Sequence, residues 1–207
     1  MSTDQTASRR GSPPAGERLS RPVIVRRAAR LIEMNGMASF SLRALAADLG
    51  VRPSALYNHV RNLDDLLSDV VAHALTELDL TDEAATWSEW LRTVALDVHH
   101  WLLARPETAG LILSRTAVTA DDSELLNRVA DRLAAASVDR TVAHIAWHVL
   151  ITVVAGAVLQ ELRPAHDRDH TFEAVLDVTL AGILALSEAP VDPRLRQLVR
   201  SHGYSDR

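Results

Sequence analysis

Apolar residues recur every three to four positions along most of this chain, which is the spacing of one face of an α-helix. No segment shows the strict alternation of a half-buried strand. Together with residues that start and stop helices, the pattern predicts about nine helices, over 22–34, 42–49, 53–60, 63–78, 85–104, 107–117, 122–136, 140–162 and 169–187. The expected fold class is therefore all-α.

Two of the shortest predicted helices, over 42–49 and 53–60, follow each other closely. Ser41 is a suitable N-cap for the first, Gly50 ends it, and Pro53 stands in the first turn of the second. Two short helices joined by a tight glycine turn are typical of a helix-turn-helix, whose second helix enters the major groove of DNA.

Charge is distributed unevenly along the chain. The 207 residues carry a net charge of −5, yet residues 1–62 hold ten arginines against four acidic residues. The first part is therefore basic by +6, and the remaining 145 residues must be acidic by −11. A basic segment of this kind favours a polyanionic partner such as double-stranded DNA, whereas the acidic remainder does not.

Composition indicates a cytoplasmic protein. The 47% of hydrophobic residues can build a core, and the absence of cysteine excludes disulfides and cysteine-based metal sites. Residues 1–19 are rich in Ser, Pro, Gly and Thr, so we expect a disordered arm and not a secretory signal. Charges or histidines interrupt every long apolar run, so no membrane span is expected.

The N-terminal residues of a helix in the major groove lie nearest to the base edges. In the second short helix this end offers one long forked donor and then small groups that permit close approach: Arg52, Pro53, Ser54 and Ala55. Arg43, in the preceding helix, is placed to reach a guanine edge or a phosphate. The flank supplies three residues suited to phosphate contacts and to one base contact, Tyr57, Asn58 and His59.

The segment LRALAADLGVRPSALYNHVRN, residues 42–62, resembles the DNA-binding domain of TetR-type transcriptional repressors. The family pattern is an Ala-rich helix, then Gly-Val, then a helix that carries Leu-Tyr-x-His-Val, which is found here at 56–60. The likeness covers residues 21–75. It implies that DNA is contacted by Ser41, Arg43, Arg52, Ser54, Tyr57 and His59.

The expected domain organisation is the arm over 1–19, a helix-turn-helix domain over 20–62 and an effector-binding and dimerisation domain over 63–207. Within the last domain, 63–78 would be the connecting helix and 140–187 the dimerisation helices. One position departs from the family. Leu63 stands where a basic residue is usual, so one phosphate contact is missing, and Arg61 or the arginines of the arm would replace it.

Single modules of this kind make few contacts, so they bind DNA as dimers on two half-sites about one turn apart. The helix over 140–162 is apolar nearly all round, and Gly156 inside it costs roughly 1 kcal/mol relative to Ala. That cost is tolerable where a helix of another subunit packs closely. In TetR-like proteins the last two long helices form a four-helix bundle with their symmetry mates, which implies a homodimer here; the alternative is an intramolecular core. The candidate interface residues are Val153, Gly156, Leu159, Leu180 and Ile183.

The middle helices, over 85–136, are expected to form the core that binds a small-molecule effector. Large flat apolar side chains occur together with a few polar groups, which is the mixture that small-molecule pockets use. Each tryptophan also suits a plain core position. The candidate pocket residues are Trp87, His99, Trp101, Arg115, His144, Trp147 and His148.

His144 and His148 stand four residues apart on one helix, a spacing that can hold a metal ion. No cysteine supports the pair and no glutamate stands within it, so we expect neither a metal nor a cofactor. No phosphate-binding loop, dinucleotide fingerprint or nucleophile motif is present, so no catalytic residue is expected. The favoured function is a ligand-responsive regulator, most readily a repressor. A ligand-independent DNA-organising protein and a helical small-molecule-binding enzyme are the alternatives.

Overall fold

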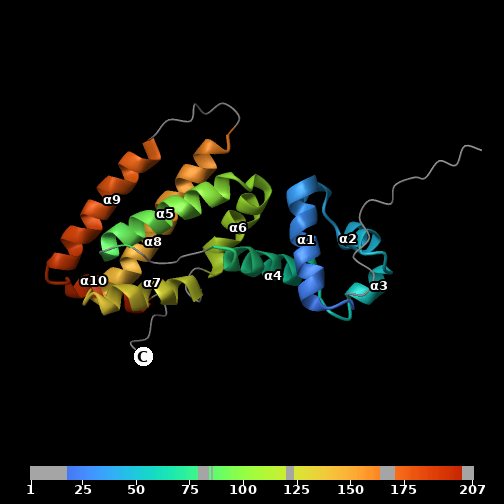
Figure 1. The fold of residues 1–207 in the computed structure, drawn as a ribbon. Coiled ribbons are helices and arrows are strands. Elements are labelled where there is room, and N and C mark those ends of the chain that lie inside the picture. Colours follow the sequence, from blue (N-terminus) through green and yellow to red (C-terminus); the bar gives the residue numbers. More distant parts are fainter. Residues whose placement is uncertain (1–17, 79–83, 85, 120–123, 164–170, 202–207) are drawn as a thin grey trace, which may run out of the picture. The chain divides into compact units, whose positions relative to one another are not determined.

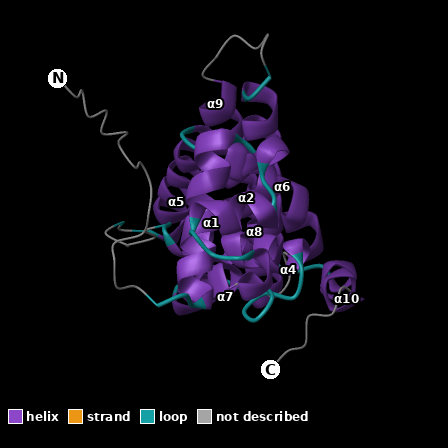
Figure 2. Cartoon of the chain, turned by 90° about the vertical axis from the view of Figure 1, so that its right-hand side faces the viewer, coloured by secondary structure: helices purple, strands orange, loops and turns teal. Residues whose placement is uncertain are grey.

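The computed structural model describes residues 18–78, 84, 86–119, 124–163 and 171–201. These residues form helices and connecting loops, and no strand occurs among them, so the all-α class is confirmed (Figure 1). The elements are α1 (Arg21–Asn35), η1 (Met37–Ser39), α2 (Leu42–Asp48), α3 (Pro53–Leu56), α4 (Leu63–Thr76), α5 (Trp87–Leu103), α6 (Pro106–Thr119), α7 (Glu124–Ala135), α8 (Arg140–Glu161), α9 (Thr171–Glu188) and α10 (Pro193–Ser201). Figure 2 shows the helices and the loops between them in separate colours.

The chain divides into two compact units, Met1–Glu77 and Leu78–Arg207. The first unit includes α4, whereas the sequence analysis assigned this helix to the second domain. The reason is packing, because α4 lies against α1 and both helices bury their apolar faces there. Of the predicted arm over 1–19, residues 1–17 lie outside the described part.

The core of the first unit is built from the stripes that the sequence pattern indicated. Ile24 and Ile32 of α1, Leu45 of α2, Leu56 of α3 and Leu66 of α4 are all fully buried. Burying a side chain of this size contributes roughly 1.5–3 kcal/mol, so this small core holds four short helices together.

Tight turns connect these helices. Gly50 has φ +68°, a conformation that glycine adopts without strain, and the amide of Val51 donates to the carbonyl of Ala46 over 2.9 Å. A side chain at position 50 would meet no neighbouring atom, so the backbone angle alone requires glycine.

Helix α3 is shorter than predicted. It ends at Leu56, and residues 57–59 form turns in which the amides of His59 and Val60 both donate to the Leu56 carbonyl. The prediction of a helix over 53–60 was therefore wrong at its C-terminal end. Leu56 and Val60 remain buried, because the turn keeps the side-chain spacing that the helix would have had.

In the second unit, α8 is the central helix and packs against α5, α7 and α9 (Figure 1). By length and apolar composition it would suffice to cross a membrane, which corrects the expectation that histidines exclude every span. The core helix of a soluble protein has the same properties, and α8 buries Val142, Leu150, Val154 and Val158 in this unit.

α10 was not predicted. Pro193 starts it, the Asp192 carboxylate accepts the amide of Arg194 over 2.8 Å, and Arg196 donates to Asp139 at the start of α8 over 3.1 Å.

Candidate nucleic-acid interface and effector region

Ser41 begins the helix-turn-helix and its hydroxyl caps α2, since the amide of Ala44 donates to Ser41 Oγ over 3.1 Å. Arg52 occupies the capping position of α3 in an extended conformation, and Pro53 starts the helix. The cap predicted at Ser41 is thereby confirmed. The backbone at Arg52 is extended, and in the first turn of α3 Pro53 and Ser54 are exposed.

Most of the predicted DNA-contacting side chains are exposed on the first unit: Arg43, Arg52, Pro53, Ser54, Tyr57, Asn58 and Arg61. The remaining three, Ser41, Ala55 and His59, are half-buried. Because Leu56 and Val60 face the core, the exposed residues of this segment lie on its outer side. Tyr57 is 58% exposed, an unusual position for an aromatic ring unless a partner covers it.

Arg43 and Arg52 have exposed side chains that make no hydrogen bond or ion pair with any residue of the described ranges. Arg27 differs, because its guanidinium contacts both carboxylate oxygens of Asp48 and so links α1 to α2. Arg43 and Arg52 can therefore turn towards a phosphate or a base without breaking a contact in the unit.

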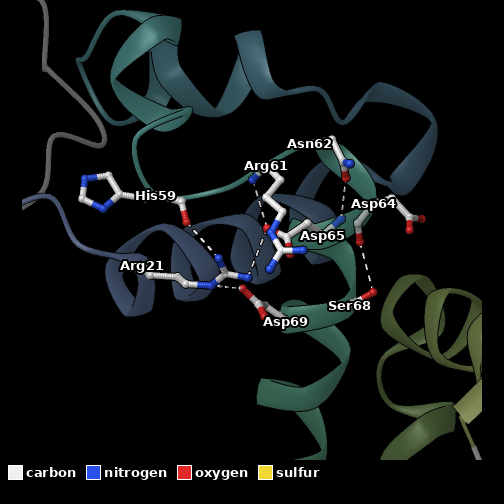
Figure 3. A network of polar contacts seen from close by, with 8 residues as sticks. All are labelled: Arg21, His59, Arg61, Asn62, Asp64, Asp65, Ser68 and Asp69. Atoms are coloured by element: carbon white, nitrogen blue, oxygen red, sulfur yellow. Dashed lines mark hydrogen bonds and ion pairs between the residues drawn. The ribbon is translucent and has the colours of Figure 1, made fainter.

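A network that the sequence did not reveal joins α1, the turn after α3 and α4 (Figure 3). Arg21 donates through Nε to Asp69 Oδ2 over 2.6 Å and through Nη1 to the carbonyl of His59 over 2.9 Å. Its Nη2 lies 3.2 Å from Asp65 Oδ2. One side chain thus connects three segments of the domain.

Asp65 has a second function in this network. The amide of Arg61 donates to Asp65 Oδ2 over 3.0 Å, and the amide of Asp65 donates to Asn62 Oδ1 over 2.8 Å, which confirms the cap predicted at Asn62. The Arg61 amide, followed by Arg21, holds the pKa of Asp65 below its ordinary value. Asp69 and then Asp65 raise the pKa of Arg21.

The second unit buries several of the predicted effector residues. The ring of His99 stacks on Phe172 with centroids 3.9 Å apart, and its Nε2 lies 2.9 Å from Glu161 Oε1. Trp147 and His144 are also buried, and the His144 and His148 rings have centroids 4.2 Å apart. These residues occupy α5, α8 and α9, which pack against one another.

The other predicted effector residues are placed differently. Trp87 and Trp101 are half-buried, and the guanidinium carbon of Arg105 lies 4.6 Å from the centroid of Trp101. The side chain of Arg115 lies outside the described part. Among the residues that are described, no group of three or more metal-ligating side chains comes together.

Three buried nitrogen atoms have no hydrogen-bond partner in the described parts of the chain: Trp90 Nε1, His99 Nδ1 and Trp147 Nε1. Leaving a buried polar group unpaired costs about 1–3 kcal/mol. Trp90 was not among the predicted effector residues, because only burial of its ring nitrogen distinguishes it from an ordinary core tryptophan.

Two predicted dimer-interface residues, Leu180 and Ile183, are buried within this chain, so they pack into its own core and present no face to a partner. Val153 is half-buried, whereas Gly156 and Leu159 are exposed. Val175 and Val178, which were not among the predicted interface residues, are exposed on α9, Val178 by 75%. The apolar pattern of α9 could not reveal which side faces inward because both sides carry apolar residues.

Comparison with known proteins identifies relatives for both units. Residues 24–70 match the family model "Bacterial regulatory proteins, tetR family". The HTH-type transcriptional regulator Rv1816 of Mycobacterium tuberculosis is 33% identical over 85 residues, which are 38% of this chain and 36% of that protein. The match therefore spans about a third of this curated relative.

Solved structures match over a longer range. A TetR variant from Acinetobacter baumannii AYE, in complex with minocycline, is 26% identical, has a TM-score of 0.71, and the match covers 83% of this chain and 100% of that one. BioQ with its natural double-stranded DNA operator is 26% identical, has a TM-score of 0.67, and the match covers 81% and 99%. Over about four fifths of its length the chain thus shares the fold of proteins solved with DNA or with a small molecule.

Proposed function

We propose that this chain is a regulator of the tetR family, whose model its residues 24–70 match, and that it represses transcription by binding a palindromic operator as a homodimer until a small-molecule effector releases it. Proteins of this family are transcriptional regulators and not enzymes, which removes the enzyme alternative. The proposal rests on the exposure of Arg43, Arg52 and Tyr57 on the outer side of the helix-turn-helix.

This side of the molecule has the chemistry for major-groove reading. The exposed first turn of α3 presents the forked donors of Arg52 together with Pro53 and Ser54, which are small enough for close approach. Tyr57 and Asn58 extend the exposed surface beyond the helix and suit phosphate contacts. BioQ, which shares this fold, was solved on its operator.

An exposed stripe on α8 and another on α9 support the homodimer. On α8 the stripe comprises Val149, Thr152, Gly156 and Leu159, at positions i, i+3, i+7 and i+10. On α9 Val175, Val178, Gly182 and Ala185 repeat the same spacing, and α8 and α9 pack against each other. A Cβ added at either glycine would have no atom of another described element within 4 Å, so both glycines leave room for a partner helix.

The effector region is proposed to lie among α5, α8 and α9. The unpaired nitrogens of Trp90, His99 and Trp147 are buried there, so an effector with hydrogen-bonding groups would recover the cost of burying them. The related Acinetobacter baumannii protein was solved with minocycline, a small molecule. An effector that prefers one arrangement of this core would release DNA through α4 with a coupling of about 1–3 kcal/mol.

The operator proposal can be tested by enriching duplexes from a random-sequence pool with purified full-length protein. We expect an inverted repeat whose half-sites are centred about one helical turn, or a multiple of it, apart. Enrichment of an unrepeated sequence, or of none, would contradict the proposal.

The effector proposal can be tested by thermal-shift measurements on a compound collection that includes minocycline. A compound at about 100 times its Kd should stabilise the protein by about 2.7 kcal/mol, and should also release the enriched duplex. The ligand-independent alternative predicts that no compound does either.

A further inference from the structure

We propose that Arg21 is a positioning residue that ties the turn following α3 to α4, so that a displacement of α4 reaches residues 57–59. The inference rests on the proposed function, because residues 57–59 are candidate DNA contacts. Figure 3 shows the arrangement: the guanidinium lies between the turn that follows α3 and the first two turns of α4.

The three partners of Arg21 belong to elements whose relative position determines how α3 is presented. The carbonyl of His59, which accepts from Arg21, belongs to the turn after α3, while Asp65 and Asp69 stand one turn apart on α4. Arg21 itself is the first residue of α1. A guanidinium is a rigid planar fork, so its contacts hold the acceptors in one geometry.

The turn between α3 and α4 has little freedom of its own. The His59 amide donates to the Leu56 carbonyl, the Arg61 amide to Asp65, and the Asp65 amide to Asn62. A shift of Asp65 with α4 would therefore move both Arg21 and the backbone at Arg61. The turn moves as a unit with the first two turns of α4.

The charge of Arg21 is compensated within the unit. Two carboxylates face its single guanidinium, at 3.2 Å for Asp65 and 2.6 Å for Asp69. The cluster therefore does not attract a phosphate, in contrast to exposed Arg43 and Arg52. Loss of Arg21 should weaken DNA binding through geometry and not through a lost phosphate contact.

The second unit contains a matched control, an arginine that also pairs with two acidic residues of one helix. Arg92 of α5 pairs with Asp177 over 2.9 Å and with Glu173 over 3.4 Å, and these acids also stand four residues apart on one helix. Replacing Arg92 with lysine disturbs the same chemistry away from residues 57–59.

The first test is hydrogen exchange of the full-length protein without DNA. Arg21→Lys keeps the charge and loses the fork, so amides of residues 57–62 should exchange at least 10-fold faster, whereas Arg92→Lys should leave them unchanged. Asp69→Asn should have the same effect as Arg21→Lys, although Asp69 makes no hydrogen bond to the described residues 57–62. The double variant should exchange no faster than either single variant.

The second test uses the duplex enriched by the unmodified protein. Arg21→Lys should lower affinity about 10-fold while the slope of log K against log salt stays the same, since about 0.9 of a unit is lost per phosphate contact removed. Circular dichroism under the binding conditions establishes that the variant is folded.

Unchanged exchange at residues 57–62 in folded Arg21→Lys would overturn the proposal, and so would additive effects in the double variant or a lowered salt slope. If no duplex is enriched, the proposed function fails, while the exchange measurements still decide whether Arg21 fixes the turn.

Discussion

At the scale of single residues, four described arginines of the first unit fall into two chemical classes. Arg21 and Arg27 are held by aspartates of α4 and α2, so their charge serves the domain itself. Arg43 and Arg52 are exposed and make no ion pair within the described ranges. Only the second class is available to a nucleic acid, which is why net charge alone overstates the number of DNA contacts.

Arg52→Ala should relax operator specificity. Loss of a bidentate contact from the first turn of α3 would reduce discrimination against a changed base by about 1–3 kcal/mol. Competition binding with the enriched duplex and its single-base variants measures the effect. The control is Arg194→Ala, which removes an exposed arginine of the second unit. Equal discrimination in both variants would remove Arg52 from the set of base-reading residues.

Asp65→Asn should weaken the pH dependence of unfolding. The pKa of Asp65 is lowered in the folded state, so its ionised form stabilises the fold above the unfolded value of about 3.9. That contribution is lost as the pH falls through the lowered pKa. Urea denaturation at a series of pH values should therefore show a destabilised variant at pH 7 and converging stabilities in acid. A difference that does not change with pH would contradict an ionic role for Asp65.

Local contacts at this scale could be predicted from the sequence, and distant ones could not. Ser41 and Asn62 cap helices through amides three residues away, so the residue type and the following helix suffice to predict them. Arg21 reaches partners 38 and 48 positions along the chain. No local pattern distinguishes it from an arginine that faces solvent.

At the scale of elements, α8 and α9 combine a buried side with an exposed apolar stripe. Leu176, Leu180 and Ile183 fill the core, whereas Val175 and Val178 face outward. The sequence indicated that the helix over 140–162 is apolar nearly all round, and it placed Leu180 and Ile183 of α9 at the interface, whereas both are buried within this chain. α10 was missed although Asp192 and Pro193 are a typical helix start, because its apolar positions are few.

Gly156→Leu should shift the protein from dimer to monomer. The helix has room for a side chain within its own chain, and leucine is the better helix former by up to about 1 kcal/mol, so the monomer is not weakened. The bulky side chain would instead separate α8 from its symmetry mate. Sedimentation velocity over a concentration series measures the change.

Gly110→Leu is the matched control for this experiment, since Gly110 is an exposed glycine of α6 that also has open space around its Cβ. It should leave the dimer intact. If both variants dimerised as strongly as the unmodified protein does, the stripe on α8 would be excluded from the interface.

At the scale of the whole molecule, charge is separated along the chain: residues 1–62 are basic and the remainder is acidic. The acidic part limits non-specific adhesion to DNA, so the basic part has to supply the attraction. This division of charge, together with the helix-turn-helix pattern, is what made the function class predictable from the sequence. The proposed effector region could not be predicted as a unit, because α5, α8 and α9 are far apart in the chain and only packing brings them together.

Deleting residues 1–18 should lower the salt dependence of DNA binding. Arg9, Arg10 and Arg18 would each contribute up to about 0.9 to the slope of log K against log salt. The measurement is titration of the enriched duplex between low and moderate salt. A full-length variant with serine at the three arginine positions separates the loss of charge from the loss of chain length. An unaltered slope would show that this segment does not touch the duplex.

The anchor formed by Arg21 has a consequence for how such a regulator could change its target. Arg21 holds the main-chain carbonyl of residue 59, an atom that every amino acid carries at that position. Libraries randomised at Tyr57, Asn58 and His59 would therefore explore new operators while retaining the connection to α4. Recognition and response could in this way evolve on separate side chains, and an engineer could retarget the first without rebuilding the second.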